Sequence, residues 1–392
     1  MLRSLADYTR FFTHTLRDRE ARALLLAHRH APRSVALDEA QRLQALSAAA
    51  DWMARAQDHS GDGGLGSYHL VHGWGRTYPE TTGYTIPSLL AMAVLLQRPD
   101  LSERAIRAGI TLLRLQRDDG GWQGGRVGED RASVVFNTAQ VVRGLLALQR
   151  HTGNEAWLDA ARRAGDWIAA TQEPDGCWRR TNFMAQARVY DTYVDAPLLQ
   201  LHAATGDPVY RAAALRNLAW VVERQAANGW FSDADNTVKH NDRPIIHTIA
   251  YTIDGLAECG ELLGDGRWLD AAHAAAVQLR QRFMAKGALN GRYDRHWNGS
   301  EAFITTGGAQ LAVAWERLAR HRDAVAYREA AARMRALLVD LQRRSAEGPE
   351  GGHGAVTGSF PLWGRYEKFA FPNWAVKYLA DALLCADGRT FC

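Results

Sequence analysis

Residues 112–122, which read LLRLQRDDGGW, decide the fold because their pattern returns along the chain. The pattern is an apolar helical run that ends in Gln, followed by a glycine-rich turn with an aromatic residue. Further copies read WIAATQEPDGCW at 167–178, WVVERQAANGWF at 220–231 and, more weakly, WMARAQDHSGDGGLG at 52–66. With two degenerate copies, the repeated glutamines are Gln57, Gln116, Gln172, Gln225, Gln281 and Gln342. Their separations of 59, 56, 53, 56 and 61 residues define an internal repeat.

Each repeat holds two helical patterns, such as SLLAMAVLL at 88–96 and AIRAGITLLRL at 105–115. Apolar residues recur at helical spacing, and Ala and Leu dominate. One helical hairpin cannot bury its apolar face alone, but six hairpins side by side share a core and close into a ring. The sequence therefore predicts an all-α (α/α)6 toroid of six helical hairpins, as a single domain over residues 1–392. The repeats span about 45–390, and we expect 1–40 to form one or two helices that close the ring.

The composition is that of a globular protein, with 47% hydrophobic and 23% charged residues. The net charge of +4 comes without a basic block, so we expect no nucleic-acid partner. No signal peptide and no uninterrupted apolar stretch of about 18 residues is evident, which predicts a cytoplasmic protein without a membrane segment. The four cysteines are scattered without a CxxC pair. We therefore expect no metal and no cofactor.

The Gln…Asp/Asn-Gly-Trp phrase resembles the QW repeat of squalene cyclases and prenyltransferases over about 45–390. The same toroid carries six-hairpin glycosidases, uronate lyases and sugar epimerases. The resemblance implies that the repeated Gln and Trp are structural, with Gln capping backbone groups and Trp stacking beneath the turn. Terpene cyclases of this fold need an acidic DxDD motif, which is absent here, and protein prenyltransferases need a zinc site. The sugar-acting branch is therefore favoured.

Six long polar loops lead into the inner helix of each hairpin and should gather at one end of the ring. They are residues 61–86, 118–140, 173–196, 228–251, 287–310 and 347–374. Loops of this length in a compact domain are usually functional. We expect the site there, at the first turns of the inner helices.

Six residues in these positions are candidates for acid–base chemistry: Glu80, Tyr84, Asp191, Asp195, His247 and Tyr251. His247 and Tyr251 are four residues apart and share one helix face. Glu80 alone could be a helix N-terminal carboxylate, and Asp191 and Asp195 could be helix caps.

The candidates for substrate binding fall into three kinds. Aromatic rings suit the C–H face of a sugar, arginines suit a carboxylate, and polar groups suit hydroxyls. They are Trp74, Arg126, Asn137, Gln140, Arg179, Tyr190, Trp297, Gln310, Trp363, Trp374 and Lys377.

These residues support a carbohydrate-active enzyme that works by general acid–base chemistry on a glycan, and the arginines favour an anionic one. Hydrolysis would use Glu80 with Asp191 or Asp195. A uronate lyase or epimerase would use Tyr84, His247 and Tyr251, and the sequence leaves this choice open. Two alternatives are an isoprenoid-handling enzyme, which predicts an apolar cavity, and a non-catalytic glycan-binding toroid.

Overall fold

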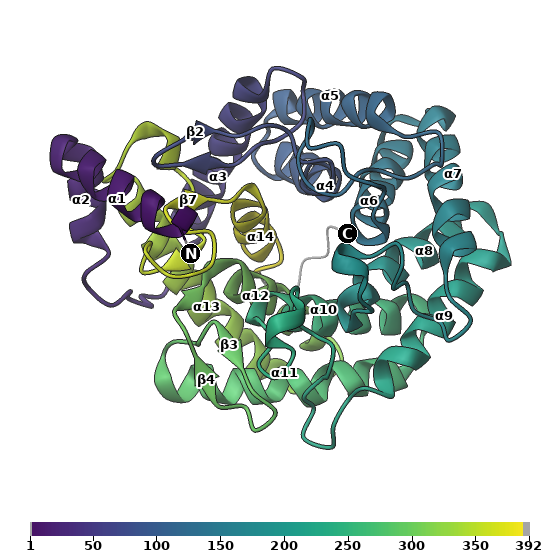
Figure 1. Cartoon of the computed structure of the whole chain (residues 1–392). Helices are drawn as coiled ribbons and strands as arrows, with labels where there is room; N and C mark the ends of the chain where they lie inside the picture. Colours follow the sequence, from purple (N-terminus) through teal and green to yellow (C-terminus); the bar gives the residue numbers. More distant parts are fainter. Residues whose placement is uncertain (1, 387–392) are drawn as a thin grey trace.

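The computed structural model describes residues 2–386 as a ring of helices (Figure 1). The helices are α1 (Leu2–Arg17), α2 (Arg19–Ala27), α3 (Glu39–Ser60), α4 (Pro79–Leu95), α5 (Pro99–Leu115), α6 (Val135–Thr152), α7 (Glu155–Thr171), α8 (Thr192–Thr205), α9 (Pro208–Val222), α10 (Ile246–Leu263), α11 (Gly266–Lys286), α12 (Thr305–Leu318), α13 (Ala324–Ser345) and α14 (Asn373–Leu384).

The even-numbered helices from α4 to α14 form an inner ring, and the odd-numbered helices from α3 to α13 surround them. Each inner helix packs on the next, and α14 packs on α4, which closes the circle. Inner helices are buried on every side, as in α10, where every residue from Ile246 to Gly260 is buried. Outer helices such as α5 bury one face only. The predicted (α/α)6 toroid is confirmed.

The N-terminal helices lie outside this ring, which differs from the closing role expected for residues 1–40. Helix α2 packs on α13, and α1 projects from the side of the ring. The closing contacts are made by α14 with α3 and α4. The ring is therefore complete without α1 and α2.

The repeated glutamines tie neighbouring hairpins together. The Nε2 of Gln116 donates to the carbonyl of Gly120 in its own turn and to that of Ala160 in the next outer helix, both at 2.9 Å. Gln57, Gln172, Gln225 and Gln342 make the same pair of bonds to a turn glycine and to the following outer helix. Gln281 is exposed and is not in this set. The expected capping role therefore holds at five of the six positions.

Two of the turn tryptophans, Trp122 and Trp178, are buried beneath their turns. Trp122 and Trp178 each donate their indole N–H to a carbonyl ten residues earlier, Leu112 and Ile168, at 2.8 and 2.9 Å. A buried indole N–H needs such a partner. Each Trp therefore locks its turn back onto the outer helix that precedes it.

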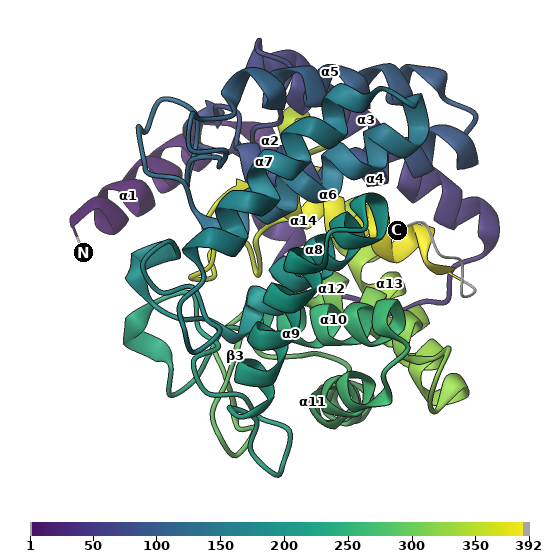
Figure 2. The same ribbon diagram turned by 90° about the vertical axis from the view of Figure 1, so that its right-hand side faces the viewer.

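Short strands connect the loops. They are β1 (Tyr68–His69), β2 (Gly73–Trp74), β3 (Arg292–Tyr293), β4 (Gly299–Ser300), β5 (Phe303–Ile304), β6 (Ser359–Phe360) and β7 (Ala370–Phe371). All pairings are antiparallel, in the orders β2-β1-β7, β3-β4 and β5-β6. Tyr68 pairs with Phe371, so the first and last loops meet where the ring closes. Figure 2 shows the long loops on one side of the ring, the side on which α1 lies.

Two glycines let α4 and α6 approach closely beside the site. A Cβ on Gly83 would lie 2.6 Å from the Cα of Val141, and a Cβ on Gly144 would lie 2.3 Å from the carbonyl oxygen of Gly83. Neither position has room for a side chain. Among the helices of residues 2–386, none combines the length and apolarity needed to cross a membrane.

Candidate active site

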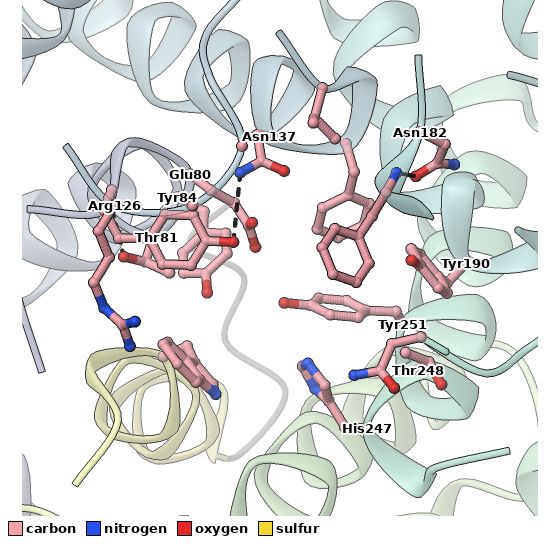
Figure 3. A pocket seen from close by; sticks show the side chains of 18 of the residues that line it. Glu80, Thr81, Tyr84, Arg126, Asn137, Asn182, Tyr190, His247, Thr248 and Tyr251 are labelled. Carbon is pink, nitrogen blue, oxygen red and sulfur yellow. Dashed lines mark hydrogen bonds between the residues drawn. The ribbon is translucent and has the colours of Figure 1, made fainter. Parts of the chain in front are cut away.

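A cavity of about 300 Å³ lies at the loop end of the ring. Its walls come from the first turns of α4, α6 and α10, from the start of α14 and from the loops before them. Eight of the residues expected to form the site line it: Glu80, Tyr84, Arg126, Asn137, Tyr190, His247, Tyr251 and Trp374. Figure 3 shows several of them projecting into one space from different helices. Five of the six loops expected to form the site therefore converge on this pocket.

Glu80 is the central carboxylate of this pocket. It lies in the first turn of α4, after Pro79, and is 9% exposed. Burial raises the pKa of Glu80 to about 7, and a hydrogen bond with Tyr78 opposes that rise. Tyr78 is held in turn by Asn137, whose Nδ2 donates to the phenol oxygen at 3.5 Å. A carboxyl group with this pKa can hold a proton near neutral pH and give it to a substrate.

Tyrosines form the floor of the pocket. Burial raises the pKa values of Tyr84 and Tyr251 well above 10, and the charge of Glu80 adds to both shifts. Both phenols are therefore neutral hydrogen-bonding groups and do not serve as bases near neutral pH. Tyr378 lies against them, with ring centroids 5.6 and 5.8 Å away. The pocket is thus closed at depth by packed rings.

His247 is held as a neutral imidazole. Burial lowers its pKa to about 4, although its hydrogen bond with Gln310 acts in the opposite direction. The bond joins Nδ1 of His247 to Oε1 of Gln310 at 2.9 Å. Because an amide oxygen only accepts, Nδ1 carries the proton and Nε2 is left as an acceptor. Gln310 therefore acts one step behind the pocket, where it sets the tautomer of His247.

A second carboxylate, Glu367, lines the pocket from the last loop together with Tyr366. Burial raises the pKa of Glu367 above its usual value of 4.5, while the positive charge of Arg126 opposes the rise. Arg126 makes only a distant ion pair, 3.9 Å from Glu129, whereas Arg131 pairs with Glu129 at 3.0 Å. The pocket thus brings a carboxyl group titrating near 7 together with a second carboxylate and a cation. Pairs of acids in unequal environments are typical of acid–base catalysis.

The two aspartates expected as acid or base lie behind the wall of the pocket. Asp191 is fully buried, and its Oδ2 accepts a 2.6 Å hydrogen bond from Asn182, which does line the pocket. Burial raises the pKa of Asp191 to about 8. Asp195 is also fully buried, and burial raises its pKa well above the usual value. Neither carboxyl group lines the pocket: the short turn Val189–Asp191 directs Tyr190 into the pocket and leaves Asp191 in the core, and Asp195 is buried in α8.

Three tryptophans expected as sugar platforms serve packing instead. Trp74 stacks on His59 with ring centroids 5.0 Å apart. Trp297 is 3% exposed and donates its indole N–H to the carbonyl of Asn228 at 3.1 Å. Trp363 is partly buried against the core, away from the pocket wall. Only Trp374 among the four predicted tryptophans reaches the pocket.

The remaining binding candidates hold the scaffold. Gln140 donates to the carbonyl of Tyr193 at 2.9 Å and so joins α6 to α8. Arg179 is bound by Glu173 and Asp175 at 2.7 and 2.5 Å. Lys377 forms a buried 2.6 Å ion pair with Asp381 beneath the tyrosine floor. The charges of Arg179 and Lys377 are paired within the chain and the amide N–H of Gln140 donates within it, and none of the three lines the pocket.

Several lining residues were not singled out from the sequence. They are Tyr78, Thr81, Glu129, Phe136, Asn182, Phe183, Asn236, Thr248, Tyr366 and Glu367. All of them lie in the loops expected to form the site. Loop 287–310, by contrast, contributes no residue to the lining. The sequence indicated only that these residues belong to a loop near the site. It did not indicate which side chains of that loop face the pocket.

Within residues 2–386, one group of side chains has the spacing of metal ligands, namely Glu173, Asp175 and Cys177. This group lies outside the pocket lining, and its carboxylates are engaged by Arg179. Cys392 lies outside the described residues.

The fold is that of known sugar hydrolases. An unsaturated glucuronyl hydrolase specific for heparin superposes with a TM-score of 0.68 at 15% identity, covering 88% of this chain and 96% of that one. The unsaturated glucuronyl hydrolase of Bacillus sp. GL1 gives 0.67 at 16% identity, over 88% and 97%. The enzyme of Streptococcus agalactiae gives 0.63 at 13%, over 89% and 92%. At such identities the likeness establishes the (α/α)6 toroid alone.

The sequence comparison goes further. Residues 34–305, well over half of the chain, match the family described as beta-L-arabinofuranosidase, GH127 catalytic domain. The chain belongs to this family and is a glycoside hydrolase. No curated protein matches it. The expectation of a carbohydrate-active enzyme is confirmed, whereas the QW-repeat kinship with squalene cyclases and prenyltransferases is not.

Proposed function

We propose that this protein is an exo-acting hydrolase that removes a terminal sugar, with Glu80 as general acid and Glu367 as general base. The observation that carries the proposal is the position of Glu80, buried at the centre of the pocket with a pKa of about 7. Exo action follows from the shape of the cavity. A volume of about 300 Å³ above a floor of packed tyrosines suits the end of a glycan and not its middle.

The reaction uses the two carboxyl groups in different protonation states. Glu80 gives its proton to the glycosidic oxygen as the bond from that oxygen to the anomeric carbon breaks. A water molecule adds its hydroxyl to the anomeric carbon, and Glu367 takes the remaining proton of that water. The positive charge of Arg126 favours the ionised form of Glu367 before the reaction.

Neutral side chains orient the sugar around these acids. Nε2 of His247 accepts a hydrogen bond from a sugar hydroxyl, since Gln310 holds the proton on Nδ1. The phenols of Tyr84 and Tyr251 and the amide of Asn137 supply donors around the ring of the sugar. Trp374, whose indole N–H is bound to the phenol oxygen of Tyr366 at 2.9 Å, provides an apolar edge.

The family points to a β-L-arabinofuranoside as the substrate. A specific observation favours a second class, the terminal unsaturated uronides of the structural neighbours. Arg126 lines the pocket without a close carboxylate partner and could bind a substrate carboxylate.

The test is hydrolysis of 4-nitrophenyl β-L-arabinofuranoside and of an unsaturated glucuronyl disaccharide by the purified full chain. We expect turnover of one of them, and a fall in kcat of about 10²–10⁴-fold in Glu80→Gln, as for loss of a general acid. Gln281→Ala, on the outer surface, is the control and should retain wild-type rates. Full activity in folded Glu80→Gln, or no turnover of either substrate, would contradict the proposal.

A further inference from the structure

The rim of the pocket carries an exposed apolar surface that binding of a terminal sugar does not account for. Phe183 lines the pocket and is still 42% exposed, and the next residue, Met184, is 50% exposed. Other phenylalanines beside the pocket and its loops, such as Phe136 and Phe369, are buried. An exposed aromatic ring beside a binding cavity often marks an interaction site.

This surface is held in place at a conformational cost. Met184 and Ala185 have φ values of 59° and 51°, in the left-handed region that side chains other than glycine rarely adopt. Two such residues in succession are strained and persist only where the surrounding structure holds them. Strain of this kind, at the edge of a pocket, is found where a side chain has to be held in one place.

Hydrogen bonds behind the rim hold this segment in its strained conformation. The side chain of Asn182 accepts a 2.8 Å hydrogen bond from the backbone N–H of Phe183 (Figure 3). The other end of that amide donates to Oδ2 of Asp191 at 2.6 Å. Asp191 is fully buried and Asn182 is 5% exposed, so the chain of contacts from Asp191 to Phe183 is anchored in the core.

The position of Phe183 matches the exit path of a leaving group. A terminal sugar that fills the closed pocket must direct its glycosidic oxygen toward the open rim. Arg126 and Arg131 give other parts of the rim a charged character. Phe183 offers a flat apolar ring, which suits the C–H face of a second sugar or an aromatic aglycone.

We propose that Phe183, with Met184 beside it, forms a leaving-group subsite that stacks on the flat apolar face of the group next to the scissile bond. Asp191 is a positioning residue for this subsite, and it acts through Asn182. The inference rests on the proposed function, since it takes the pocket as the site of the terminal sugar.

The test measures binding of matched methyl and phenyl glycosides by calorimetry on Glu80→Gln, which separates affinity from turnover. The pairs are the β-L-arabinofuranosides and the β-D-glucuronides. We expect the phenyl member of one pair to bind about tenfold more tightly than the methyl member, the size of one aromatic stacking contact. Adding Phe183→Ala should abolish that ratio, and Phe183→Trp should keep it. Adding Leu262→Ala, which trims another exposed apolar side chain at the end of α10 opposite His247, should leave it unchanged.

The positioning role has its own readout. Asp191→Asn keeps an oxygen that can accept from Asn182 and should preserve the phenyl-to-methyl ratio, whereas Asp191→Leu should lose it. The subsite is refuted if no phenyl glycoside binds more tightly than its methyl partner, or if Phe183→Ala keeps the ratio. Failure of the wild-type chain to hydrolyse any glycoside would refute the proposed function and leave the ratio as a separate result.

Discussion

At the scale of single residues, the pocket separates the protonation states of its acids by their surroundings. Glu80 is surrounded by aromatic rings and a phenol hydroxyl, and burial dominates its pKa. Glu367 is also buried, but the positive charge of Arg126 opposes the rise in its pKa. A proton is therefore retained more strongly by Glu80 than by Glu367, which is the order that acid-catalysed bond cleavage needs.

This order predicts the pH dependence of kcat/KM. Activity should fall as the pH rises through about 7, because Glu80 then loses the proton it must donate. It should fall again at lower pH as Glu367, whose pKa burial raises above its usual value, becomes protonated. Steady-state rates from pH 4 to 9 measure both limbs.

Tyr78 provides a check on the assignment of the alkaline limb. Its hydrogen bond lowers the pKa of Glu80, so Tyr78→Phe should move that limb to higher pH. In Glu80→Gln the limb should disappear from the residual activity. An unchanged alkaline limb in both variants would assign it to another group.

Individual residues were predictable where helix geometry alone decides their direction. His247 and Tyr251 were expected together because they are four residues apart, and both line the pocket. Tyr190 and Asp191 show the limit, since adjacent residues in an irregular segment face opposite ways. The sequence carries no period there from which a direction could be derived.

At the scale of elements, α1 supports the loop that carries Glu367. Phe11 is fully buried and stacks on Phe369 with ring centroids 3.8 Å apart. Tyr8 packs edge-on against the same ring, and its hydroxyl donates to the carbonyl of Trp363 at 3.2 Å. The helix that takes no part in the ring thus fixes residues 361–371, and with them Glu367.

Phe11→Ala should therefore loosen this loop. We expect the free energy of unfolding to fall by about 3–5 kcal/mol, with faster amide hydrogen exchange in 361–371 and a lower kcat/KM. Phe12→Ala is the matched control, because Phe12 is adjacent on the same helix and 50% exposed. Equal exchange in the two variants would mean that α1 does not hold the loop.

The position of Glu367 in the pocket could not be predicted from the sequence. Its position depends on contacts between the two ends of the chain, Phe11 with Phe369 and Tyr68 with Phe371. Glu80, by contrast, needs only the start of α4 to point into the ring. Local sequence signals can therefore identify a residue such as Glu80, but not one such as Glu367, whose position depends on contacts between distant segments.

At the scale of the whole molecule, the glutamine bonds join hairpin to hairpin around the ring. Gln342 makes the bond that closes it, because its Nε2 donates to the carbonyls of Ala45 in α3 and Gly354 at 2.9 and 2.8 Å. The steady spacing of the glutamines predicted the ring because each marks the end of one outer helix. The position of α1 and α2 outside the ring could not be predicted in this way, because these two helices are not part of the repeat.

Gln342→Ala should lower the free energy of unfolding by about 1–3 kcal/mol, because two buried carbonyls lose a donor. Gln281→Ala should cost close to nothing, since that side chain is exposed. Urea denaturation of both variants measures the difference. Equal stability would show that packing alone closes the ring.

Ring closure by α14 also has a consequence for biosynthesis. Glu80, Tyr84, His247 and Tyr251 have all left the ribosome before the segment with Tyr366, Glu367 and Trp374 is translated. The residue that we propose as the base that activates water, Glu367, is therefore among the last parts of the pocket to be synthesised. Under the proposed mechanism, we expect hydrolysis only after synthesis has passed the last hairpin, and none from a polypeptide that ends before it.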